Sequence, residues 1–365
     1  IYDQSAAAVT IDLAAGTASG GDADGDVLIG IETISGSAFA DRLTGSTADD
    51  TLIGNDGDDI LAGGDGDDTL IGGAGADQLN GGNGIDTLLY DSSPTGVVVS
   101  LTTGTTQGGH AAGDIITGIE NLGGSAFDDR LRGDETANTL IGNDGDDILS
   151  GRAGDDALLG GAGADQLDGG SGIDRALYGS SSAAVIIDLA AGTAAGGDAT
   201  GDVLIDVEGL SGSAFNDRLA GDEGANSLSG DAGDDILSGR GGNDILTGGA
   251  GADQLDGGDG NDLVLYAGSD SAVNVDLATG TASGGHAEGD SFIGIEGVGG
   301  SSFNDVLSGT DGDDTLLGEA GDDMLTGGAG ADYLDGGDGF DRASYATDTT
   351  GISINLTTGI GSGGS

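Results

Sequence analysis

The sequence predicts an all-β protein: a right-handed parallel β-roll, or β-solenoid, with two nine-residue repeats in each coil. Three observations predict this fold. Nonapeptides recur in phase 23 times, with Asp at position 6 in all but two of them. Glycine supplies 81 of the 365 residues, and aromatic residues make up only 3%. Glycine-rich turns that alternate with short apolar segments at a fixed period are typical of a solenoid, in which each repeat packs mainly on its neighbours.

The charge of the chain excludes several classes of partner. There are 65 acidic residues and only eight basic ones, all arginine, so the formal net charge is -57. Such a chain is repelled by nucleic acid and by anionic membrane surfaces, and it has no apolar stretch of about 18 residues that could span a membrane. Cysteine is absent, so no disulfide bond can stabilise the fold. The acidity therefore indicates either a disordered acidic chain or a fold that depends on cations.

The nonapeptides are grouped in blocks within larger units of 88 residues. Tyrosines mark the starts of these units at Tyr2, Tyr90, Tyr178 and Tyr266, and Tyr345 follows early because the fourth unit has one nonapeptide fewer. Blocks of six nonapeptides span 36–89, 124–177 and 212–265, a block of five spans 300–344, and spacers occupy 1–35, 90–123, 178–211, 266–299 and 345–365. Because the first and last units are incomplete, we expect the chain to be part of a longer protein.

The spacers are expected to continue the solenoid and not to form flexible linkers. Each opens with an alternating apolar pattern, as in residues 9–13, which predicts a short strand followed by a glycine turn. A degenerate nonapeptide follows at 21–29, 109–117, 197–205 and 285–293. It keeps an acid at position 6, which is Asp26, Asp114, Asp202 or Asp290. A Gly/Ser linker would lack these regularly spaced apolar residues.

The nonapeptide GGDGDDTLI (63–71) shows how one repeat is expected to fold. Its glycines allow a tight turn over the first six positions. The last three residues form a short strand, and the central Leu70 points inward to meet Leu79 of the facing strand. Coils then stack about 4.8 Å apart, which is the ordinary strand spacing. The predicted core is therefore a thin double row of position-8 side chains.

Stacking of this kind places carboxylates above one another. Asp59 is predicted to lie over Asp77, and Asp68 over Asp86, because each coil contains two nonapeptides. Two carboxylates about 5 Å apart repel by roughly 3 kcal/mol at an effective dielectric of about 20. A divalent cation between them reverses the sign of this interaction, and turn carbonyls can complete an all-oxygen shell. Calcium suits such irregular shells better than magnesium, and zinc or copper would need more His or Cys. Metal binding and folding are thus expected to be one event.

The repeats GNDGDDILA (54–62), GGDGDDTLI (63–71) and GGAGADQLD (160–168) resemble the GGxGxDxUx repeat of the RTX (repeats-in-toxin) family. The resemblance covers the nonapeptide blocks closely and the spacers less closely. It implies calcium held between adjacent coils by position-6 Asp side chains and turn carbonyls. It also implies type I secretion of a chain that stays unfolded in the calcium-poor cytosol and folds outside the cell, so we expect a secreted, extracellular or cell-surface bacterial protein.

The resemblance implies a large set of calcium ligands, with roughly one ion for each well-formed loop. The predicted side-chain ligands are Asp50, Asp59, Asp68, Asp77, Asp86, Asp147, Asp156, Asp165, Asp174, Asp235, Asp244, Asp253, Asp262, Asp314, Asp323, Asp332 and Asp341. The predicted carbonyl ligands belong to Gly54, Asp56, Gly57, Gly63, Gly64, Asp65, Gly66, Gly72, Gly73, Ala74, Gly75, Gly142, Gly145, Gly160, Gly163, Gly248, Gly251, Gly327 and Gly330. The spacer residues Asp26, Asp114, Asp202 and Asp290 are further candidates for metal binding.

Several loops depart from the pattern. The first repeat of each block has Phe at position 4, in place of Gly, and these loops are expected to cap the core and to bind calcium weakly or not at all. They contain Phe39, Phe127, Phe215 and Phe303. Asn138 and Asn226 lack the charge of Asp at position 6, which puts their sites in doubt. The acids at position 5 are interpreted as solvated surface.

Other recurring residues allow more than one reading. Glu32, Glu120, Glu208 and Glu296 are either metal ligands or partners of arginine. His110 and His286 are expected on the loop surface and not in a catalytic site. The tyrosines at the block ends, with Ile85, Ile173 and Phe340 nearby, are expected to close the edge of the roll, and carbohydrate stacking is the alternative.

These features favour a structural or adhesive calcium-binding module, such as part of a fibre, surface layer or adhesin stalk, since the large units follow one another with no other domain. Its expected partners are calcium and further copies of the repeat or cell-surface or matrix material, without nucleic acid or membrane insertion. The alternative is the calcium-folding tail of a secreted protease, lipase or alginate-modifying enzyme. Catalysis by the repeats themselves is not expected, because lysine is absent and the two histidines are isolated.

Overall fold

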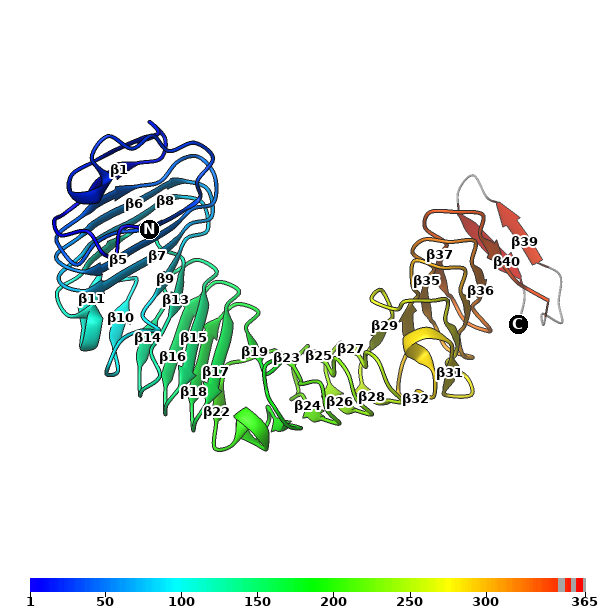
Figure 1. Cartoon of the computed structure of the whole chain (residues 1–365). Coiled ribbons are helices and arrows are strands. Elements are labelled where there is room, and N and C mark those ends of the chain that lie inside the picture. The colour runs from blue at the N-terminus through cyan, green and yellow to red at the C-terminus, as the bar shows by residue number, and fades with distance from the viewer. Residues whose placement is uncertain (347–351, 356–358, 364–365) are drawn as a thin grey trace. The chain divides into compact units, whose positions relative to one another are not determined.

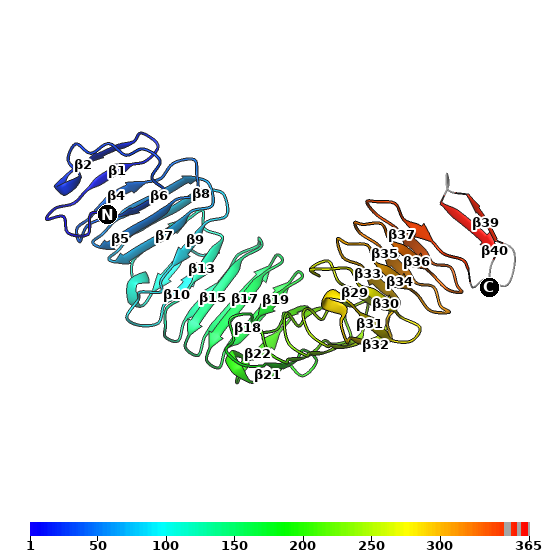
Figure 2. The ribbon, with the colours of Figure 1, turned by 45° about the vertical axis from the view of Figure 1, so that its right-hand side comes forward.

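The computed structural model describes residues 1–346, 352–355 and 359–363 and divides into two compact units. Unit 1 comprises Ile1–Leu177 and Thr193–Val207, and unit 2 comprises Tyr178–Gly192 and Glu208–Ser365. Within each unit, short parallel strands stack on one another into long sheets (Figures 1 and 2). The predicted all-β, parallel β-roll is therefore confirmed.

One face of unit 1 is an unbroken parallel stack. Its strands, in spatial order, are β3 (Thr33–Ser35), β5 (Thr51–Asp56), β7 (Thr69–Ala74), β9 (Thr87–Leu89), β13 (Asn121–Gly123), β15 (Thr139–Asp144), β17 (Ala157–Ala162) and β19 (Arg175–Leu177). Strand β13 comes from the spacer, and it pairs with β9 of the preceding block and β15 of the next. The solenoid on this face thus runs through the spacer without interruption, as predicted.

The opposite face of unit 1 is divided by the spacer into two sheets. The first contains β12 (Ile115–Thr117), β8 (Gln78–Asn83), β6 (Ile60–Asp65), β4 (Arg42–Thr44), β1 (Thr10–Asp12) and β2 (Thr17–Ser19). The second contains β11 (Thr105–Gln107), β10 (Val98–Ser100), β14 (Arg130–Arg132), β16 (Ile148–Ala153), β18 (Gln166–Ser171) and β22 (Val203–Ile205). The antiparallel hairpin β10–β11 lies at the start of the second sheet. Strand β12 of the same spacer pairs with β8 and is the last strand of the first sheet.

Unit 2 is also built from two stacked faces, but its spacer hairpin joins the two halves of the second face into one sheet through the pairing of β31 with β32. One face contains β23 (Gly209–Ser211), β25 (Ser227–Ser229), β27 (Ile245–Thr247), β29 (Leu263–Leu265), β33 (Gly297–Gly299), β35 (Thr315–Leu317) and β37 (Tyr333–Asp335). The other contains β20 (Ile186–Asp188), β24 (Arg218–Ala220), β26 (Ile236–Gly241), β28 (Gln254–Asp259), β32 (Ser291–Ile293), β31 (Thr281–Ser283), β30 (Asn274–Asp276), β34 (Val306–Ser308), β36 (Met324–Thr326) and β38 (Arg342–Ala343). A separate antiparallel pair follows, β39 (Ile352–Asn355) and β40 (Ile360–Gly363).

The remaining elements are short. Strand β21 spans Thr193–Ala195, and single 3₁₀ turns occur at Gly21–Ala23, Gly109–Ala111, Gly197–Ala199 and Gly285–Ala287. Among the described residues, no helix is long and apolar enough to cross a membrane.

The strand register shows that two nonapeptides make one coil. Thr51 pairs with Thr69, and Leu61 pairs with Leu79, so equivalent residues stack at a separation of 18. Several strands of the first three blocks are six residues long, longer than the three residues expected. In β5 and β7 the pairing continues through Asn55 opposite Gly73, because the first half of the loop is also extended and hydrogen-bonded to the next coil.

The position-8 side chains form the predicted thin core. Leu43, Leu52, Leu61 and Leu70 are completely buried, and the equivalent leucines of the other blocks are at most 2% exposed, except Leu334, which is half-buried. Each strand contributes one inward side chain, and its two neighbours are half-buried or exposed. The core is therefore only two side chains thick, and each coil depends on the coils above and below it.

Replacement of one of these leucines should weaken the roll strongly. Leu70→Ala leaves a cavity in a core with no second layer to fill it, and it should lower the free energy of unfolding by about 2–5 kcal/mol. Urea denaturation in saturating calcium measures this loss. Gln78→Ala, on an exposed side chain of the next repeat, is the matched control and should change stability by about 0.5 kcal/mol or less. Equal effects of the two substitutions would show that the leucine row is not the core.

Candidate metal centres

The position-6 aspartates form two hydrogen-bonded ladders in each block, one along each row of loops. In the first row, the backbone N–H of Asp41 donates to Oδ1 of Asp59 at 2.6 Å, and that of Asp59 donates to Oδ1 of Asp77 at 2.8 Å. The second row repeats this geometry from Asp50 to Asp68 and from Asp68 to Asp86, at 2.8 Å in both cases. The predicted stacking of these carboxylates is thus present, and the ladder hydrogen bonds determine which oxygen remains available.

The second oxygen of most ladder carboxylates is buried and has no hydrogen-bond donor. These side chains are 0–2% exposed. Their Oδ2 atoms lack a partner in Asp59, Asp68, Asp77, Asp86, Asp147, Asp156, Asp165, Asp235, Asp244, Asp253, Asp262 and Asp323. Buried polar atoms are nearly always satisfied in folded proteins, and a buried carboxylate oxygen without a donor is costly. A repeated set of such atoms indicates a repeated partner, and a cation is the natural one.

Each of these oxygens lies against the position-1 glycine of its loop, and in many loops a backbone carbonyl of the next coil lies there as well. A β carbon on Gly54 would collide both with Oδ2 of Asp59 and with the carbonyl oxygen of Gly72. The same overlap occurs at Gly142, where the colliding atoms are Oδ2 of Asp147 and the carbonyl oxygen of Gly160. Position 1 must therefore be glycine, and oxygen atoms from two successive coils converge there. This all-oxygen set, part carboxylate and part carbonyl, fits calcium.

Without a cation, the ionised form of several ladder carboxylates is destabilised, and their pKa values are raised. Burial, together with the charges of Asp77 and Asp41, raises the pKa of Asp59 to about 7, although the Asp41 N–H bound to its carboxylate acts in the opposite direction. The same cause raises the pKa of Asp68 and Asp77 to about 6. The pKa of Asp147 and that of Asp235 likewise rise to about 7. A divalent cation would stabilise the ionised form and offset both burial and the repulsion along the ladder.

The remaining predicted ligands differ in their surroundings. Both oxygens of Asp314 accept hydrogen bonds from Thr310, whose N–H lies 2.6 Å from Oδ2. Oδ2 of Asp50 accepts the Ser46 N–H at 2.6 Å, while its Oδ1 has no partner. Asp332 and Asp341 accept the ladder N–H groups of Asp314 and Asp323 but are less buried than the others. The assignment of individual side chains and carbonyls as ligands stays a prediction.

The spacer residues Asp114 and Asp290 end the first ladder of their blocks. Oδ1 of Asp114 accepts the Asp77 N–H at 2.9 Å, and its Oδ2 accepts the Tyr90 hydroxyl at 2.9 Å. Asp290 bonds in the same way to the Asp253 N–H and to the hydroxyl of Tyr266. These aspartates thus occupy position 6 of the degenerate nonapeptide of the spacer, as expected. The second oxygen of each carboxylate, however, accepts a hydrogen bond from a neutral tyrosine hydroxyl. Metal binding at these positions stays a prediction.

The spacer glutamates Glu120 and Glu296 end the second ladder of the block before them. Oε2 of Glu120 accepts the Asp86 N–H at 2.8 Å, and Glu296 does the same for Asp262 at 3.0 Å. Arginine pairing, one of the two readings from sequence, does not occur for Glu120 and Glu296. The arginine ion pairs in the described part of the chain instead join Arg152 to Glu135 and Arg240 to Asp188.

Several predictions for aromatic and apolar residues are corrected. Tyr90, Tyr178 and Tyr266 are 1–2% exposed, so they lie within the roll and offer no face for carbohydrate stacking. Ile85 and Ile173 were expected to help close the edge, but they are 60% and 62% exposed. Phe39, Phe127, Phe215 and Phe303 are 43–47% exposed, so they do not cap the core. All of these exposed side chains project from loop positions, where the chain faces solvent.

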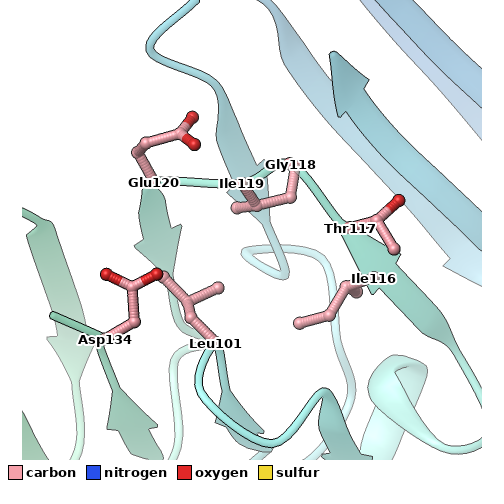
Figure 3. Close-up of a pocket in the computed structure, with 7 residues that line it drawn as sticks. All are labelled: Leu101, Ile116, Thr117, Gly118, Ile119, Glu120 and Asp134. Atoms are coloured by element: carbon pink, nitrogen blue, oxygen red, sulfur yellow. The ribbon is translucent and has the colours of Figure 1, made fainter. Parts of the chain in front are cut away.

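A small pocket of about 120 Å³ lies at the spacer of unit 1, where the two sheets of one face meet (Figure 3). Figure 3 shows that it is lined by Leu101, Ile116, Thr117, Gly118, Ile119, Glu120 and Asp134. Its polar groups are already engaged in the fold: Glu120 holds the Asp86 N–H, and the Thr117 hydroxyl donates to Asn80. Oδ1 of Asp134 accepts two hydrogen bonds from Thr136. The pocket therefore belongs to the structural ladder.

The comparison with protein families agrees with the loop geometry. The model of the RTX calcium-binding nonapeptide repeat matches residues 26–61, 53–88, 123–158, 141–176, 211–246, 230–264, 299–334 and 308–343. No curated protein matches the chain. The matched segments cover more than half of the sequence and coincide with the loops that bear the buried carboxylate ladders. The chain is thus a calcium-binding repeat module and belongs to the RTX nonapeptide-repeat family.

Proposed function

We propose that the chain is an extracellular structural or adhesive module, part of a fibre, surface layer or adhesin stalk, that calcium folds and rigidifies. The observation that carries this proposal is the set of buried Oδ2 atoms without donors, of which blocks 1, 2 and 3 each contain several and block 4 contains that of Asp323. A fold that needs one cation site after another is unfolded where calcium is scarce and rigid where it is plentiful. Such a property suits a load-bearing element outside the cell.

The chemistry of the side chains supports a non-catalytic role. Arg240 makes two hydrogen bonds with Asp188, at 2.8 and 2.6 Å, and Arg152 donates to Thr102 at 2.7 Å. These arginines therefore fasten residues of a spacer to the block that follows it. The buried carboxylates are held in ladders at regular intervals, whereas an acid–base site brings a few groups of different pKa together. The same coupling of calcium to folding would suit the tail of a secreted enzyme, but four successive blocks favour the structural role.

Mechanical and proteolytic resistance test this proposal. In millimolar calcium, force spectroscopy should show discrete unfolding events. Under the same conditions, trypsin should leave the chain uncut at the arginines of the blocks. In chelator, the chain should extend without resistance and be cleaved rapidly. Incubation with anionic polysaccharides in calcium should give no product. Mechanical softness in calcium, or turnover of a polysaccharide, would refute the structural role.

A further inference from the structure

The first two loops of every block have a hydrogen-bonding arrangement that the later loops lack. In the first repeat of block 1, the Ser37 N–H donates to Oδ2 of Asp41 at 2.5 Å, and in the second, the Ser46 N–H donates to Oδ2 of Asp50 at 2.6 Å. The position-2 N–H bonds to the position-6 side chain in all eight such loops of the four blocks. In these loops, the side-chain oxygen that corresponds to the donor-free Oδ2 of the later repeats therefore already accepts a hydrogen bond.

A second hydrogen bond holds these loops in the same conformation. The side-chain oxygen of position 2 accepts the N–H of position 4, as Ser37 does for Phe39 at 3.2 Å and Ser46 does for Ala48 at 3.1 Å. Again all eight loops share it, with Ser, Thr or Asp at position 2. Short polar side chains of this kind are known to stabilise local turns. We call these eight loops, at 36–41, 45–50, 124–129, 133–138, 212–217, 221–226, 300–305 and 309–314, the closed loops.

From the third repeat onward, position 2 adopts a positive φ. In block 1 these residues are Asn55, Gly64, Gly73 and Gly82, with φ between 79° and 126°. In the other blocks they are Asn143, Arg152, Gly161, Gly170, Asp231, Arg240, Gly249, Gly258, Glu319, Gly328 and Gly337. We call these loops open, because position 2 does not close onto the carboxylate. The loop with Asp231 at position 2 is open, although Asp at this position closes other loops. The hydroxyl groups of Ser211 and Ser229 donate hydrogen bonds to the Asp231 carboxylate, so this side chain does not bind the N–H of its own loop.

The sequence contains an independent sign that closed loops do not need a charge at position 6. Asn occurs at this position only at 138 and 226, and both lie in the second, closed loop of a block. Oδ1 of Asn138 accepts the Asp134 N–H at 2.8 Å, and its amide donates to the Glu120 carbonyl at 2.8 Å. A neutral amide thus satisfies every bond that this loop requires.

We propose that position 2 selects which loops bind calcium: Ser, Thr or Asp closes the first two loops of each block against the ion, and calcium occupies only the open loops from the third repeat onward. This inference rests on the proposed calcium-dependent function and reassigns Asp50 and Asp314 from ligands to loop-closing groups. An N–H bound to Oδ2 disfavours a cation at that oxygen, because it occupies one of the oxygen's acceptor sites and the positive N–H end repels the ion.

The closed loops give each block a beginning that calcium does not have to stabilise. The first ladder starts from a carboxylate whose two oxygens both accept hydrogen bonds: Oδ1 of Asp41 accepts the Val9 N–H at 2.6 Å and the Ser37 hydroxyl at 2.8 Å, and its Oδ2 accepts the Ser37 N–H. In the second closed loop, Oδ2 of Asp50 accepts the Ser46 N–H, and only its Oδ1 has no donor. At the other end, the Tyr90 hydroxyl satisfies Asp114. The first ladder of block 1 therefore has neutral hydrogen-bond donors at both ends, comparable to the capping repeats of other solenoids.

Conversion of one closed loop in block 2 tests the proposal. Asn138→Asp restores only the charge, whereas Asn138→Asp combined with Asp134→Gly and Thr136→Gly also opens the loop. Calcium bound to the 365-residue chain is counted by native mass spectrometry and equilibrium dialysis. We expect no additional ion in Asn138→Asp and one additional ion in the triple variant. Asp156→Asn, in an open loop of the same ladder, should lose at least one ion.

Each outcome decides between named alternatives. An additional ion in Asn138→Asp alone would overturn the proposal, because charge and not loop closure would then select the site. The absence of any gain in the triple variant, or of any loss in Asp156→Asn, would overturn it as well. A wild-type chain that binds no calcium would instead refute the proposed function, so the two failures are distinguishable. Circular dichroism in calcium confirms that the variants keep their β structure, and the triple variant remains informative even if Asp156→Asn unfolds.

Discussion

Transfer of the chain into excess chelator at pH 8 should abolish its β circular-dichroism signal, and millimolar calcium should restore it. Each nonapeptide buries one leucine and fixes nine backbone residues, so the hydrophobic core is too thin to offset the ordering entropy. The carboxylates of Asp59, Asp68 and Asp77 add an electrostatic cost, since each is buried next to another acid. Calcium binding removes that cost, and folding and binding then occur together.

The transition should be steep in calcium concentration, because many sites in one stack fold together. Magnesium at the same concentration is the matched control, and it should restore much less signal, since it demands octahedral geometry and retains its water. Sodium chloride at equal ionic strength should restore little, because the ladder carboxylates are buried and poorly screened. Equal β content in chelator and in calcium would contradict the coupling of metal binding to folding.

The metal-free chain should regain β structure when the pH is lowered from 8 to 5. Burial next to other acids raises the folded pKa of Asp59, Asp147 and Asp235 to about 7, well above the ordinary aspartate value of 3.8. The folded state then holds more protons than the unfolded state between about pH 4 and pH 7. The destabilisation from these groups is fully present above pH 7 and decreases as the pH falls toward 4. Acid should therefore partly replace calcium.

The same protonation should weaken calcium binding, because proton and metal compete for the ladder carboxylates. The calcium concentration at half-maximal β signal should rise as the pH falls from 8 to 6. Circular dichroism in chelator and calcium titrations at each pH provide both measurements. A metal-free signal that is constant from pH 8 to 5, together with a midpoint that does not move, would show that the ladder carboxylates are not the linked groups.

Much of the site was predictable because position in the repeat determines position in the coil. Two nonapeptides per coil place Asp59 under Asp77, and the structure joins this pair by a hydrogen bond of 2.8 Å. The same reasoning predicted that Asp114, at position 6 of the degenerate nonapeptide 109–117, belongs to the ladder. In the structure, the Asp77 N–H donates to it at 2.9 Å. Exposure was harder to predict: Phe39 and Ile85 are apolar but project from loops, where no facing strand covers them.

The sequence by itself determined the period, the two-repeat coil, the leucine row and the identity of the stacked acids, because a fixed nine-residue spacing admits one register. Only the tertiary structure decided which buried carboxylate oxygens have no hydrogen-bond donor. That choice depends on whether the N–H of residues such as Ser46 turns toward the acid of its own loop, or whether position 2, as in Gly64, takes a positive φ and leaves the oxygen open. Local turn hydrogen bonds and contacts with the next coil decide it together, and periodicity does not encode them.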